Sequence, residues 1–465
     1  MNALDLNRDT IVAVSTPHGM GGIAVVRVSG PDALPLVEQR WRGAKLATMQ
    51  SHTAHLGQLL DAQGELLDEV VLTLYRGPHS FTGEDVVELA CHGSVWIQRQ
   101  VVNTLIEAGC RAATGGEFTQ RAFANGKMDL SQAEAIADVI ASGSRAAHRV
   151  AMNQMRGAFG RELSALRSQL LEFVSLIELE LDFSEEDVNF ADRSRLIDLA
   201  TNIHGVIGRL SRSFAVGNAI KHGVPVAIVG ASNAGKSTLL NGLLRDDRAL
   251  VSDIAGTTRD VIEDTMVLDG VQFRFIDTAG IRESADVIEN MGIERSFQKM
   301  DEAQIVLWVI DATTGMGEAQ RLAATIAQRC AGKQLIAVVN KTDVAAGEPI
   351  VAALQQLLPG GTAVMAISAK SSADVERLEQ LIVERAMLPE VDSEALIVTN
   401  ARHYEALVRA GEAIERSIEG LRTGVSGDFV SQEIRECMHY LGEITGEIST
   451  DDILGEIFAR FCIGK

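Results

Sequence analysis

The 465-residue sequence predicts a multidomain α/β protein, and three observations support this prediction. The length suits about three domains. Residues 10–120 mix short apolar runs, which are typical of strands, with helical patterns, and this mixture indicates an α+β domain. Long helical patterns rich in Leu, Ala, Glu and Arg fill residues 131–220 and resume after 370, whereas buried strands alternate with helices between them.

Individual elements follow from the spacing of apolar residues. Residues 10–14 and 22–28 are predicted strands, and residues 96–108 and 163–181 are predicted helices. The segment 19–22, Gly-Met-Gly-Gly, joins the two strands and is typical of a hairpin turn rather than of a phosphate-binding loop.

The domain boundaries follow from these patterns. We expect an N-terminal α+β domain at 1–125, a discontinuous helical bundle domain at 126–220 and 376–465, and an inserted domain at 221–375. One bundle with an insertion is the simpler arrangement, because surface loops tolerate inserted domains whose termini lie close together. Two independent helical domains are the alternative.

The inserted domain begins with the signature of a phosphate-binding loop. An apolar run at 224–229 leads into Gly-Ala-Ser-Asn-Ala-Gly-Lys-Ser, and a helical pattern begins near Lys236. Gly230 and Gly235 allow backbone N–H groups to turn toward phosphate oxygens, and Lys236 offsets phosphate charge. Ser237 is the predicted ligand of Mg²⁺. Strand, loop and helix together predict a P-loop nucleotide-binding domain.

Two further loops carry residues suited to the γ-phosphate and to magnesium. The strand pattern at 271–276 runs into Asp277-Thr-Ala-Gly280, where Asp277 can hold a magnesium-bound water and the Gly280 N–H can contact the γ-phosphate. The polar loop that precedes this strand contains Thr257 and Thr258. Thr258 is the predicted second hydroxyl on Mg²⁺, and Thr257 is the alternative.

The last two loops predict which base is bound. Asn340-Lys-Thr-Asp343 and Ser368-Ala-Lys370 each follow a buried strand pattern. The Asp343 carboxylate can accept from N1–H and the exocyclic amine of guanine, whereas adenine leaves it unpaired, and such sites discriminate by roughly 10⁴. The motifs therefore predict a Ras-like GTPase domain, and an ATPase conflicts with Asn-Lys-Thr-Asp.

The residue that orients the attacking water is not the usual one. Ile281 occupies the position where many GTPases carry a glutamine, and its side chain can neither place water nor offset charge. The polar candidates downstream are Arg282, Glu283, Asp286 and Glu289, and their spacing does not choose among them.

Five segments, G-A-S-N-A-G-K-S, D-I-A-G-T-T-R-D, D-T-A-G-I-R, N-K-T-D and the C-terminal F-C-I-G-K, make the chain resemble the bacterial tRNA-modification GTPases of the MnmE (TrmE) family over essentially its whole length. In that family the G domains dimerise around a potassium ion that replaces an arginine finger. The resemblance implies that Glu289 orients the catalytic water. It also implies that the K⁺ ligands are Asn233, Ser252, Ile254 and Thr257, whose oxygens suit a hard cation.

Motifs and resemblance together complete the predicted nucleotide site, in which Ser237 and Thr258 are the expected Mg²⁺ ligands. The predicted GTP-binding residues are Asn233, Ala234, Gly235, Lys236, Ser237, Thr238, Ser252, Asp253, Ile254, Ala255, Gly256, Thr257, Thr258, Asp277, Thr278, Ala279, Gly280, Asn340, Lys341, Thr342, Asp343, Ser368, Ala369 and Lys370.

Three charged residues of the N-terminal domain are candidate ligand contacts. Arg27 interrupts an apolar strand pattern, Glu84 lies in Phe-Thr-Gly-Glu-Asp, and Lys127 follows Asn-Gly, although each alone is also typical of a surface charge. The resemblance implies that this domain dimerises and binds a one-carbon tetrahydrofolate derivative through these residues and Lys465. Basic groups suit the glutamate tail, and a carboxylate suits the pterin. Cys462 is a candidate for chemistry, or a packed residue.

Composition limits the remaining possibilities. The formal net charge of −21 disfavours nonspecific binding to a polyanion, so contact with tRNA is expected to be local or partner-assisted. The sequence has no long uninterrupted apolar run and no signal pattern, which predicts a soluble, cytoplasmic protein without a membrane segment. Five cysteines without a Cys-x-x-Cys pair indicate neither disulfides nor zinc.

The resemblance also implies a function. With a flavin-dependent partner, in a heterotetramer or larger assembly, the chain is expected to install an aminomethyl or carboxymethylaminomethyl group at C5 of the wobble uridine of certain tRNAs. GTP would supply conformational switching, and folate would supply carbon. The alternative is a regulatory or assembly-factor GTPase without a direct role in covalent RNA modification, which would need neither the folate-type residues nor the C-terminal tail.

Overall fold

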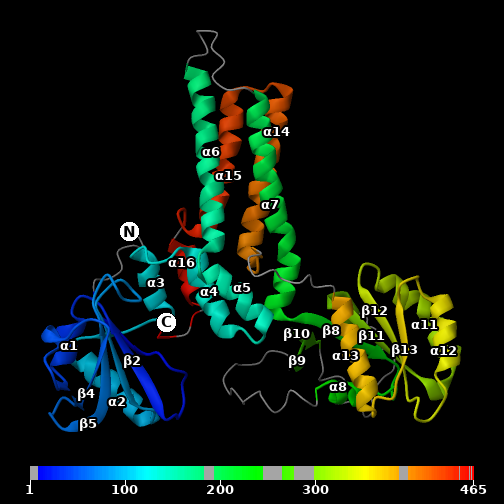
Figure 1. Cartoon of the computed structure of the whole chain (residues 1–465), viewed down its shortest axis with the longest axis horizontal. Helices are drawn as coiled ribbons and strands as arrows, with labels where there is room; N and C mark the ends of the chain where they lie inside the picture. The colour runs from blue at the N-terminus through cyan, green and yellow to red at the C-terminus, as the bar shows by residue number, and fades with distance from the viewer. Residues whose placement is uncertain are drawn as a thin grey trace. The chain divides into compact units, whose positions relative to one another are not determined.

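A computed structural model of the chain describes residues 9–182, 193–244, 264–276, 298–386, 396–449, 451–459, 461, 463 and 464. The chain divides into two compact units (Figure 1). The first unit consists of Met1–Ile140, Met152–Gly208 and Glu405–Lys465, and the second consists of Ala141–Ala151 and Arg209–Tyr404.

The N-terminal part of the first unit is an α+β domain built on one sheet. Its seven described strands lie in the order β3-β4-β5-β6-β2-β1-β7. They are β1 (Ile11–Val14), β2 (Ile23–Ser29), β3 (Trp41–Arg42), β4 (Thr53–Leu60), β5 (Leu66–Tyr75), β6 (Val86–His92) and β7 (Arg111–Ala112). The strands predicted at 10–14 and 22–28 are confirmed, and they pair antiparallel as β1 and β2.

Two helices cover one face of this sheet. α1 (Ala33–Glu38) and α2 (Val95–Ala108) bury Val37 and Leu105 in the same apolar cluster as Leu89 of β6. Alternate residues of β5 are buried, as expected of a strand with one covered face.

Further short elements complete the N-terminal domain. A 3-10 helix, η1 (Leu46–Thr48), precedes β4, and α3 (Glu117–Ala124) follows β7. Phe118 of α3 packs with Ile11 and Ala13 of β1 in a second, smaller apolar cluster. Since Val12 belongs to the first cluster, the two clusters lie on opposite faces of β1.

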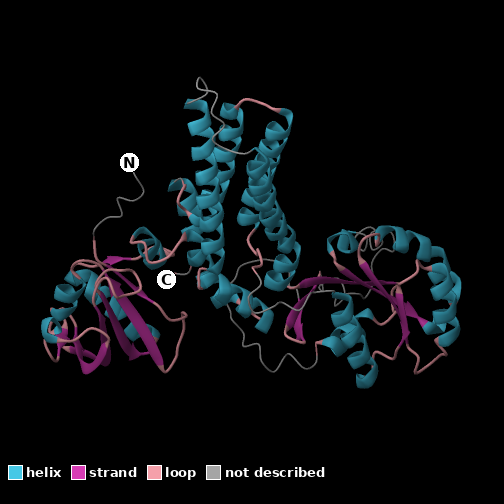
Figure 2. Ribbon diagram, turned by 45° about the horizontal axis from the view of Figure 1, so that its top comes forward, coloured by secondary structure: helices cyan, strands magenta, loops and turns pink. Residues whose placement is uncertain are grey.

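Two helices that are far apart in the sequence pack together in the first unit. α6 (Ala158–Asp182) and α15 (Gly427–Thr445) lie side by side (Figures 1 and 2). Ion pairs join Arg167 to Glu447 and Glu178 to Arg435. This unit also contains the shorter helices α4 (Leu130–Ala141) and α16 (Asp451–Ala459), and parts of the long helices α7 (Arg193–His222) and α14 (Ala401–Thr423). Within the described residues, no helix combines the length and the apolar character needed to cross a membrane.

The second unit contains a mostly parallel sheet. Its six described strands lie in the order β13-β12-β11-β8-β10-β9. They are β8 (Val224–Gly230), β9 (Asp264–Leu268), β10 (Val271–Phe275), β11 (Ile305–Asp311), β12 (Gln334–Asn340) and β13 (Ala363–Ala366). Neighbouring strands are parallel except for β9, which runs antiparallel to β10 at the edge.

Both faces of this sheet are covered, which explains why β11 is buried along its whole length. Val226 and Ile228 of β8 belong to one apolar cluster, and Ala227 and Val229 belong to another. The helices of the domain are α8 (Lys236–Leu243), α11 (Met316–Arg329), α12 (Glu348–Leu357) and α13 (Ser372–Ala386), and η4 (Ala312–Thr314) is a 3-10 turn. The carboxyl ends of parallel strands meet at one edge, so the loops after β8, β11, β12 and β13 come together there.

Short parts of the helical segments also pack with this domain. In α5 (Arg145–Met155), Ala147 shares an apolar cluster with Ile220, near the end of α7, and with Ile397, which precedes α14. The Ala146 N–H donates to the carbonyl of Gly270, in the turn between β9 and β10, at 3.2 Å.

Candidate nucleotide and N-terminal polar sites

The phosphate-binding loop lies between β8 and α8, as the sequence predicts. Its backbone takes positive φ angles at Gly230 (152°), Asn233 (65°) and Gly235 (92°). A side chain on Gly230 would place its Cβ 2.2 Å from the Val309 carbonyl oxygen, so this position has room only for glycine. Turns of this kind direct successive N–H groups toward an anion, next to the positive end of α8.

The Lys236 ammonium lies over this loop. Its Nζ donates to the carbonyls of Gly230 and Ala231 at 2.8 and 2.7 Å. Burial lowers the pKa of this lysine, and the nearby charge of Lys299 adds to the effect. A phosphate bound in the loop would take the place of the two carbonyls as the partner of the Lys236 ammonium. Its negative charge would favour the protonated form of the lysine.

The Asn340 side chain connects three of the five predicted nucleotide loops. Its Nδ2 donates to the Ala234 carbonyl and its Oδ1 accepts from the Ala369 N–H, both at 2.9 Å. Asn340 is 2% exposed, so its amide serves the assembly of the site. A Cβ on Gly235 would lie 2.2 Å from Nδ2, which gives this glycine a second reason to lack a side chain.

Lys341 is anchored by a residue that the sequence analysis missed. Its backbone is left-handed, with φ 68°, and its Nζ donates to Asp311 Oδ2 at 2.6 Å. Burial alone would raise the pKa of Asp311, but hydrogen bonds from Lys341 and Thr313 prevail and lower it. Asp311 ends the apolar strand β11, and a carboxylate at the carboxyl end of such a strand was the available signal.

Asp343 is oriented by the following loop. Oδ1 accepts from Ser368 Oγ and Oδ2 accepts from Lys370 Nζ, each at 3.1 Å. The Lys370 hydrogen bond is the main reason why the pKa of Asp343 is lowered. The carboxylate is therefore ionised at neutral pH, and each oxygen keeps a lone pair for a ligand donor. The Thr342 N–H donates to the Ile367 carbonyl at 3.2 Å, which holds the two base loops together.

The structure brings together one part of the predicted nucleotide set, namely Asn233, Ala234, Gly235, Lys236, Ser237, Thr238, Asn340, Lys341, Thr342, Asp343, Ser368, Ala369 and Lys370. Another part lies outside the described residues, namely Ser252, Asp253, Ile254, Ala255, Gly256, Thr257, Thr258, Asp277, Thr278, Ala279, Gly280 and Glu289.

In the N-terminal domain, Arg27 and Lys127 contact the loop between β5 and β6, and this loop carries Glu84. Arg27 is ion-paired with Glu88 at 2.8 Å, and its guanidinium lies 5.3 Å from the centre of the Phe81 ring. Lys127 Nζ donates to the carbonyl of Pro78, in the same loop, at 2.8 Å. The three residues predicted from the sequence therefore belong to one neighbourhood.

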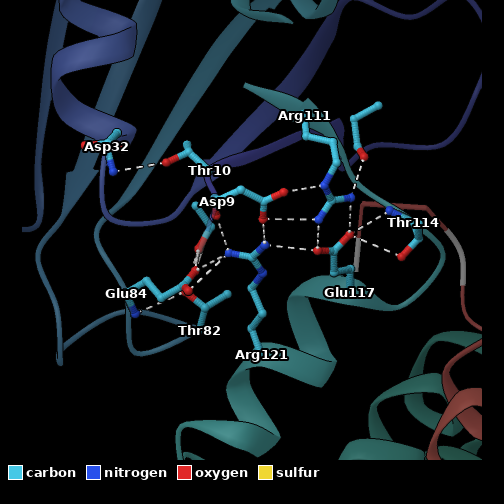
Figure 3. A network of polar contacts seen from close by, with 11 residues as sticks. Asp9, Thr10, Asp32, Thr82, Glu84, Arg111, Thr114, Glu117 and Arg121 are labelled. Carbon is cyan, nitrogen blue, oxygen red and sulfur yellow. Dashed lines mark hydrogen bonds and ion pairs between the residues drawn. The ribbon is translucent and has the colours of Figure 1, made fainter. Parts of the chain in front are cut away.

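Glu84 is part of an ionic network that the sequence analysis missed (Figure 3). Arg121 Nη1 lies 3.2 and 3.3 Å from the two Glu84 oxygens, and Arg121 Nη2 donates to Asp9 and Glu117. Arg111 Nε donates to Asp9 Oδ2 at 2.5 Å, and Arg111 Nη2 donates to Glu117 Oε1 at 2.5 Å. The signal was a glutamate and an arginine four residues apart on one helix, Glu117 and Arg121 of α3.

The charges of this network do not balance. Among its described members, three carboxylates meet two guanidinium groups, which leaves one negative charge in excess. The pKa of Asp9 is lowered, chiefly by its hydrogen bond with Arg111. Burial works against ionisation of Glu117, yet its pKa is also lowered, because Arg111 and the Thr114 N–H donate to it. Glu84 has the longest ion pair of the set and keeps acceptor capacity for a ligand.

The C-terminal tail packs on the N-terminal domain. Ile463 forms an antiparallel bridge with Gly115, and Ser15 Oγ donates to the Gly464 carbonyl at 3.0 Å. Gly464 has φ 97°, and a Cβ there would lie 2.1 Å from the Val14 carbonyl oxygen. Lys465 and Cys462, predicted as a folate contact and a candidate for chemistry, lie outside the described residues.

The four cysteines in the described part of the chain are free and buried. Burial raises the pKa of each thiol, to about 11 or 12. These thiols are therefore protonated and unreactive at neutral pH. They are Cys91, Cys110, Cys330 and Cys437.

Comparison with known proteins extends these observations to the whole chain. Residues 10–127 match the family described as GTP-binding protein TrmE N-terminus, and residues 130–462 match the MnmE helical domain. The chain is 53% identical over 467 residues to the tRNA modification GTPase MnmE of Bacteroides thetaiotaomicron, an alignment that covers 99% of this chain and 100% of that protein. The Flavobacterium johnsoniae protein of the same name is 48% identical, with 99% and 100% covered.

Among solved structures, the chain is similar to Era in complex with MgGDPNP and nucleotides 1506–1542 of 16S ribosomal RNA, with 30% identity, a TM-score of 0.29, and coverage of 41% of this chain and 66% of that chain. The full-length relatives and the two family matches lead to one conclusion. This chain belongs to the MnmE (TrmE) family of tRNA modification GTPases.

Proposed function

We propose that this chain hydrolyses GTP in the course of tRNA modification, at C5 of the wobble uridine of certain tRNAs. A flavin-dependent partner and a one-carbon tetrahydrofolate are part of the proposal, and the added group is aminomethyl or carboxymethylaminomethyl. The observation that carries the GTP assignment is the ionised Asp343 carboxylate, held by Ser368 and Lys370 at the edge where the strands end. Two adjacent acceptors suit the N1–H and amine of guanine.

In the proposed mechanism, the protein places the phosphates and offsets their charge. Backbone N–H groups of the loop 230–235 hold the phosphate oxygens, and the Lys236 ammonium moves from the loop carbonyls to the β- and γ-phosphates. Ser237, in the first turn of α8, would hold Mg²⁺ together with Thr258. When bound, magnesium would offset the negative charge of the phosphates.

Potassium and Glu289 complete the proposed hydrolytic site. Asn233 stands in a left-handed turn of the phosphate loop, and its amide oxygen is of the type that K⁺ prefers. The proposed K⁺ ligands are Asn233, Ser252, Ile254 and Thr257, in a pair of G domains. GTP hydrolysis should be faster in potassium than in sodium, and Asn233→Ala should abolish the difference. Glu289→Ala should lower turnover with little change in nucleotide affinity.

The proposed folate site uses the neighbourhood of Glu84. The excess negative charge there suits the amine and ring N–H of a pterin, and Arg27, Lys127 and Lys465 suit a carboxylate tail. Arg27 already pairs with Glu88, so a tail carboxylate would have to share that guanidinium or displace Glu88. Calorimetry with 5-formyltetrahydrofolate should show binding that Glu84→Ala weakens.

The decisive experiment is analysis of wobble uridines in tRNA from a strain that lacks this chain. Loss of the C5 modification, restored by the wild-type gene but not by an Asp343→Asn variant, supports the proposal. If the wobble uridines of that strain are still modified, the alternative of a regulatory or assembly-factor GTPase is supported instead. Xanthosine triphosphate should in turn rescue Asp343→Asn in a GTPase assay, because the exchanged amide suits the changed base.

The proposal also covers assembly and location. We propose a homodimer that joins a flavin-binding partner in a heterotetramer or larger complex, in the cytoplasm, with tRNA contact assisted by the partner. The proposed domains are 1–125, then 126–220 with 376–465, and the insertion 221–375. Limited proteolysis that releases a stable fragment of 224–375 would support the insertion, whereas cleavage throughout that segment would argue against it.

A further inference from the structure

Arg121 is the most buried charged group of the N-terminal network, and the proposed folate site gives it no role. Its side chain is 2% exposed. Nη1 donates to the Asp9 carbonyl at 2.8 Å and reaches both Glu84 oxygens, and Nη2 donates to Asp9 Oδ1 at 2.8 Å and to Glu117 Oε1 at 3.0 Å (Figure 3). One guanidinium thus connects α3, the N-terminal segment and the loop that carries Glu84.

Stability alone is a weak reason for this arrangement. Buried ion pairs can often be replaced by packed apolar residues without loss of stability. Arg121 Nε is also buried without a hydrogen-bond partner among the residues described, which is a cost that a purely structural contact would avoid. The contacts that Nη1 and Nη2 make are therefore a better explanation for an arginine at this position.

The Glu84 carboxylate is held in place by side chains from separate parts of the chain, and Arg121 is one of them. Oε2 accepts from Ser29 Oγ at 2.7 Å, and Nη1 of Arg121 lies within 3.3 Å of both carboxylate oxygens. The Glu84 N–H donates to Thr82 Oγ1 at 3.2 Å, which fixes the backbone as well. The Glu84 side chain nevertheless remains 22% exposed. The carboxylate is therefore held by fixed partners and is still partly exposed.

We propose that Arg121 is a positioning residue of the folate site: its planar fork orients the Glu84 carboxylate to receive the adjacent N–H donors of a pterin. This inference rests on the proposed binding of folate. A lysine would keep the positive charge but would present a point charge in place of the fork, so it should not keep the orientation. Arg111 provides a matched control, because its described contacts reach Asp9 and Glu117 and not Glu84.

The test is calorimetric titration of the full-length protein with 5-formyltetrahydrofolate. Arg121→Lys should weaken binding roughly tenfold, and Arg111→Lys should stay within roughly threefold of wild type. The double variant Arg121→Lys/Glu84→Gln should bind no more weakly than Glu84→Gln alone, because Arg121 acts through Glu84. A merely structural role would instead give additive losses, and the two lysine variants would behave alike.

The outcomes separate the two proposals. If the wild type does not bind the folate, the folate assignment is wrong and this inference falls with it. If the wild type binds and Arg121→Lys binds equally well, or if the losses add, only the positioning role is wrong. Should Arg121→Lys not fold, as judged by circular dichroism, Glu117→Gln takes its place. It removes a carboxylate that anchors Arg121, so it should weaken binding non-additively with Glu84→Gln, and additivity would overturn the inference.

Discussion

Replacing Asn340 by alanine should loosen the phosphate loop and a base loop at once. The side chain makes two hydrogen bonds of 2.9 Å, to the Ala234 carbonyl and from the Ala369 N–H. Both partner residues are buried, so water cannot replace the lost amide easily. A buried group left unpaired costs about 1–3 kcal/mol, which gives a loss of about 2–6 kcal/mol for the two.

Two measurements check this value. Urea unfolding of the protein should show the lower stability. Hydrogen exchange of the Ala369 N–H should also accelerate, by roughly tenfold for each 1.4 kcal/mol of lost protection. Asn340→Asp is the matched comparison, because it keeps the acceptor for Ala369 and loses the donor to Ala234. It should protect the Ala369 N–H while still lowering stability. A change within about 0.5 kcal/mol for alanine, with Ala369 still protected, would refute the reasoning.

Three further predictions follow from packing and charge. Gly217→Ala in α7 should destabilise the protein by about 1–3 kcal/mol in thermal unfolding, because the new Cβ would lie 2.0 Å from a backbone carbonyl oxygen of the segment that precedes α14. In Gly205→Ala, in the same helix, the new Cβ would have no atom within 4 Å, so this change should stabilise the protein by up to about 1 kcal/mol. Because the pKa of Asp311 is lowered in the folded protein, its ionised form stabilises the fold above the ordinary carboxyl pKa of about 4, and this stabilisation is lost as the pH falls below that value. Lys341→Met should therefore reduce the stability at neutral pH and make the stability fall less steeply with pH on the acid side. Cys437, with a thiol pKa raised to about 12, should resist alkylation at pH 8 until the protein is unfolded, as mass spectrometry can show.

At the nucleotide site, the local elements were predictable from the sequence and the contacts between distant loops were not. The strand at 224–229, the turn and the helix that begins at Lys236 were predictable, because glycine placement and apolar spacing are local properties. The use of Asn340 as a tie between loops was not predictable, since it depends on two partners more than 25 residues away in either direction. Asp311 was missed for the same reason: its partner Lys341 lies 30 residues further along the chain, directly after the neighbouring strand β12.

In the N-terminal domain, too, the sequence predicted individual residues but not the contacts between them. The sequence marked Arg27, Glu84 and Lys127 individually, and the resemblance suggested a shared ligand. Only the folded chain shows that Arg27 and Lys127 contact the loop that carries Glu84, and that the buried Arg121 is ion-paired with Glu84.

By itself, the sequence determined the α+β, helical and P-loop classes, the nucleotide motifs and the family, because periodicity and motif spacing report on neighbours along the chain. The tertiary structure decided which charges meet. It joined Asp9 to Arg111 and Arg121, placed Gly464 against the first strand, and packed α6 on α15. The physical reason is that ion pairs and close backbone contacts depend on distances set by chain closure over long loops, and no local pattern encodes those distances.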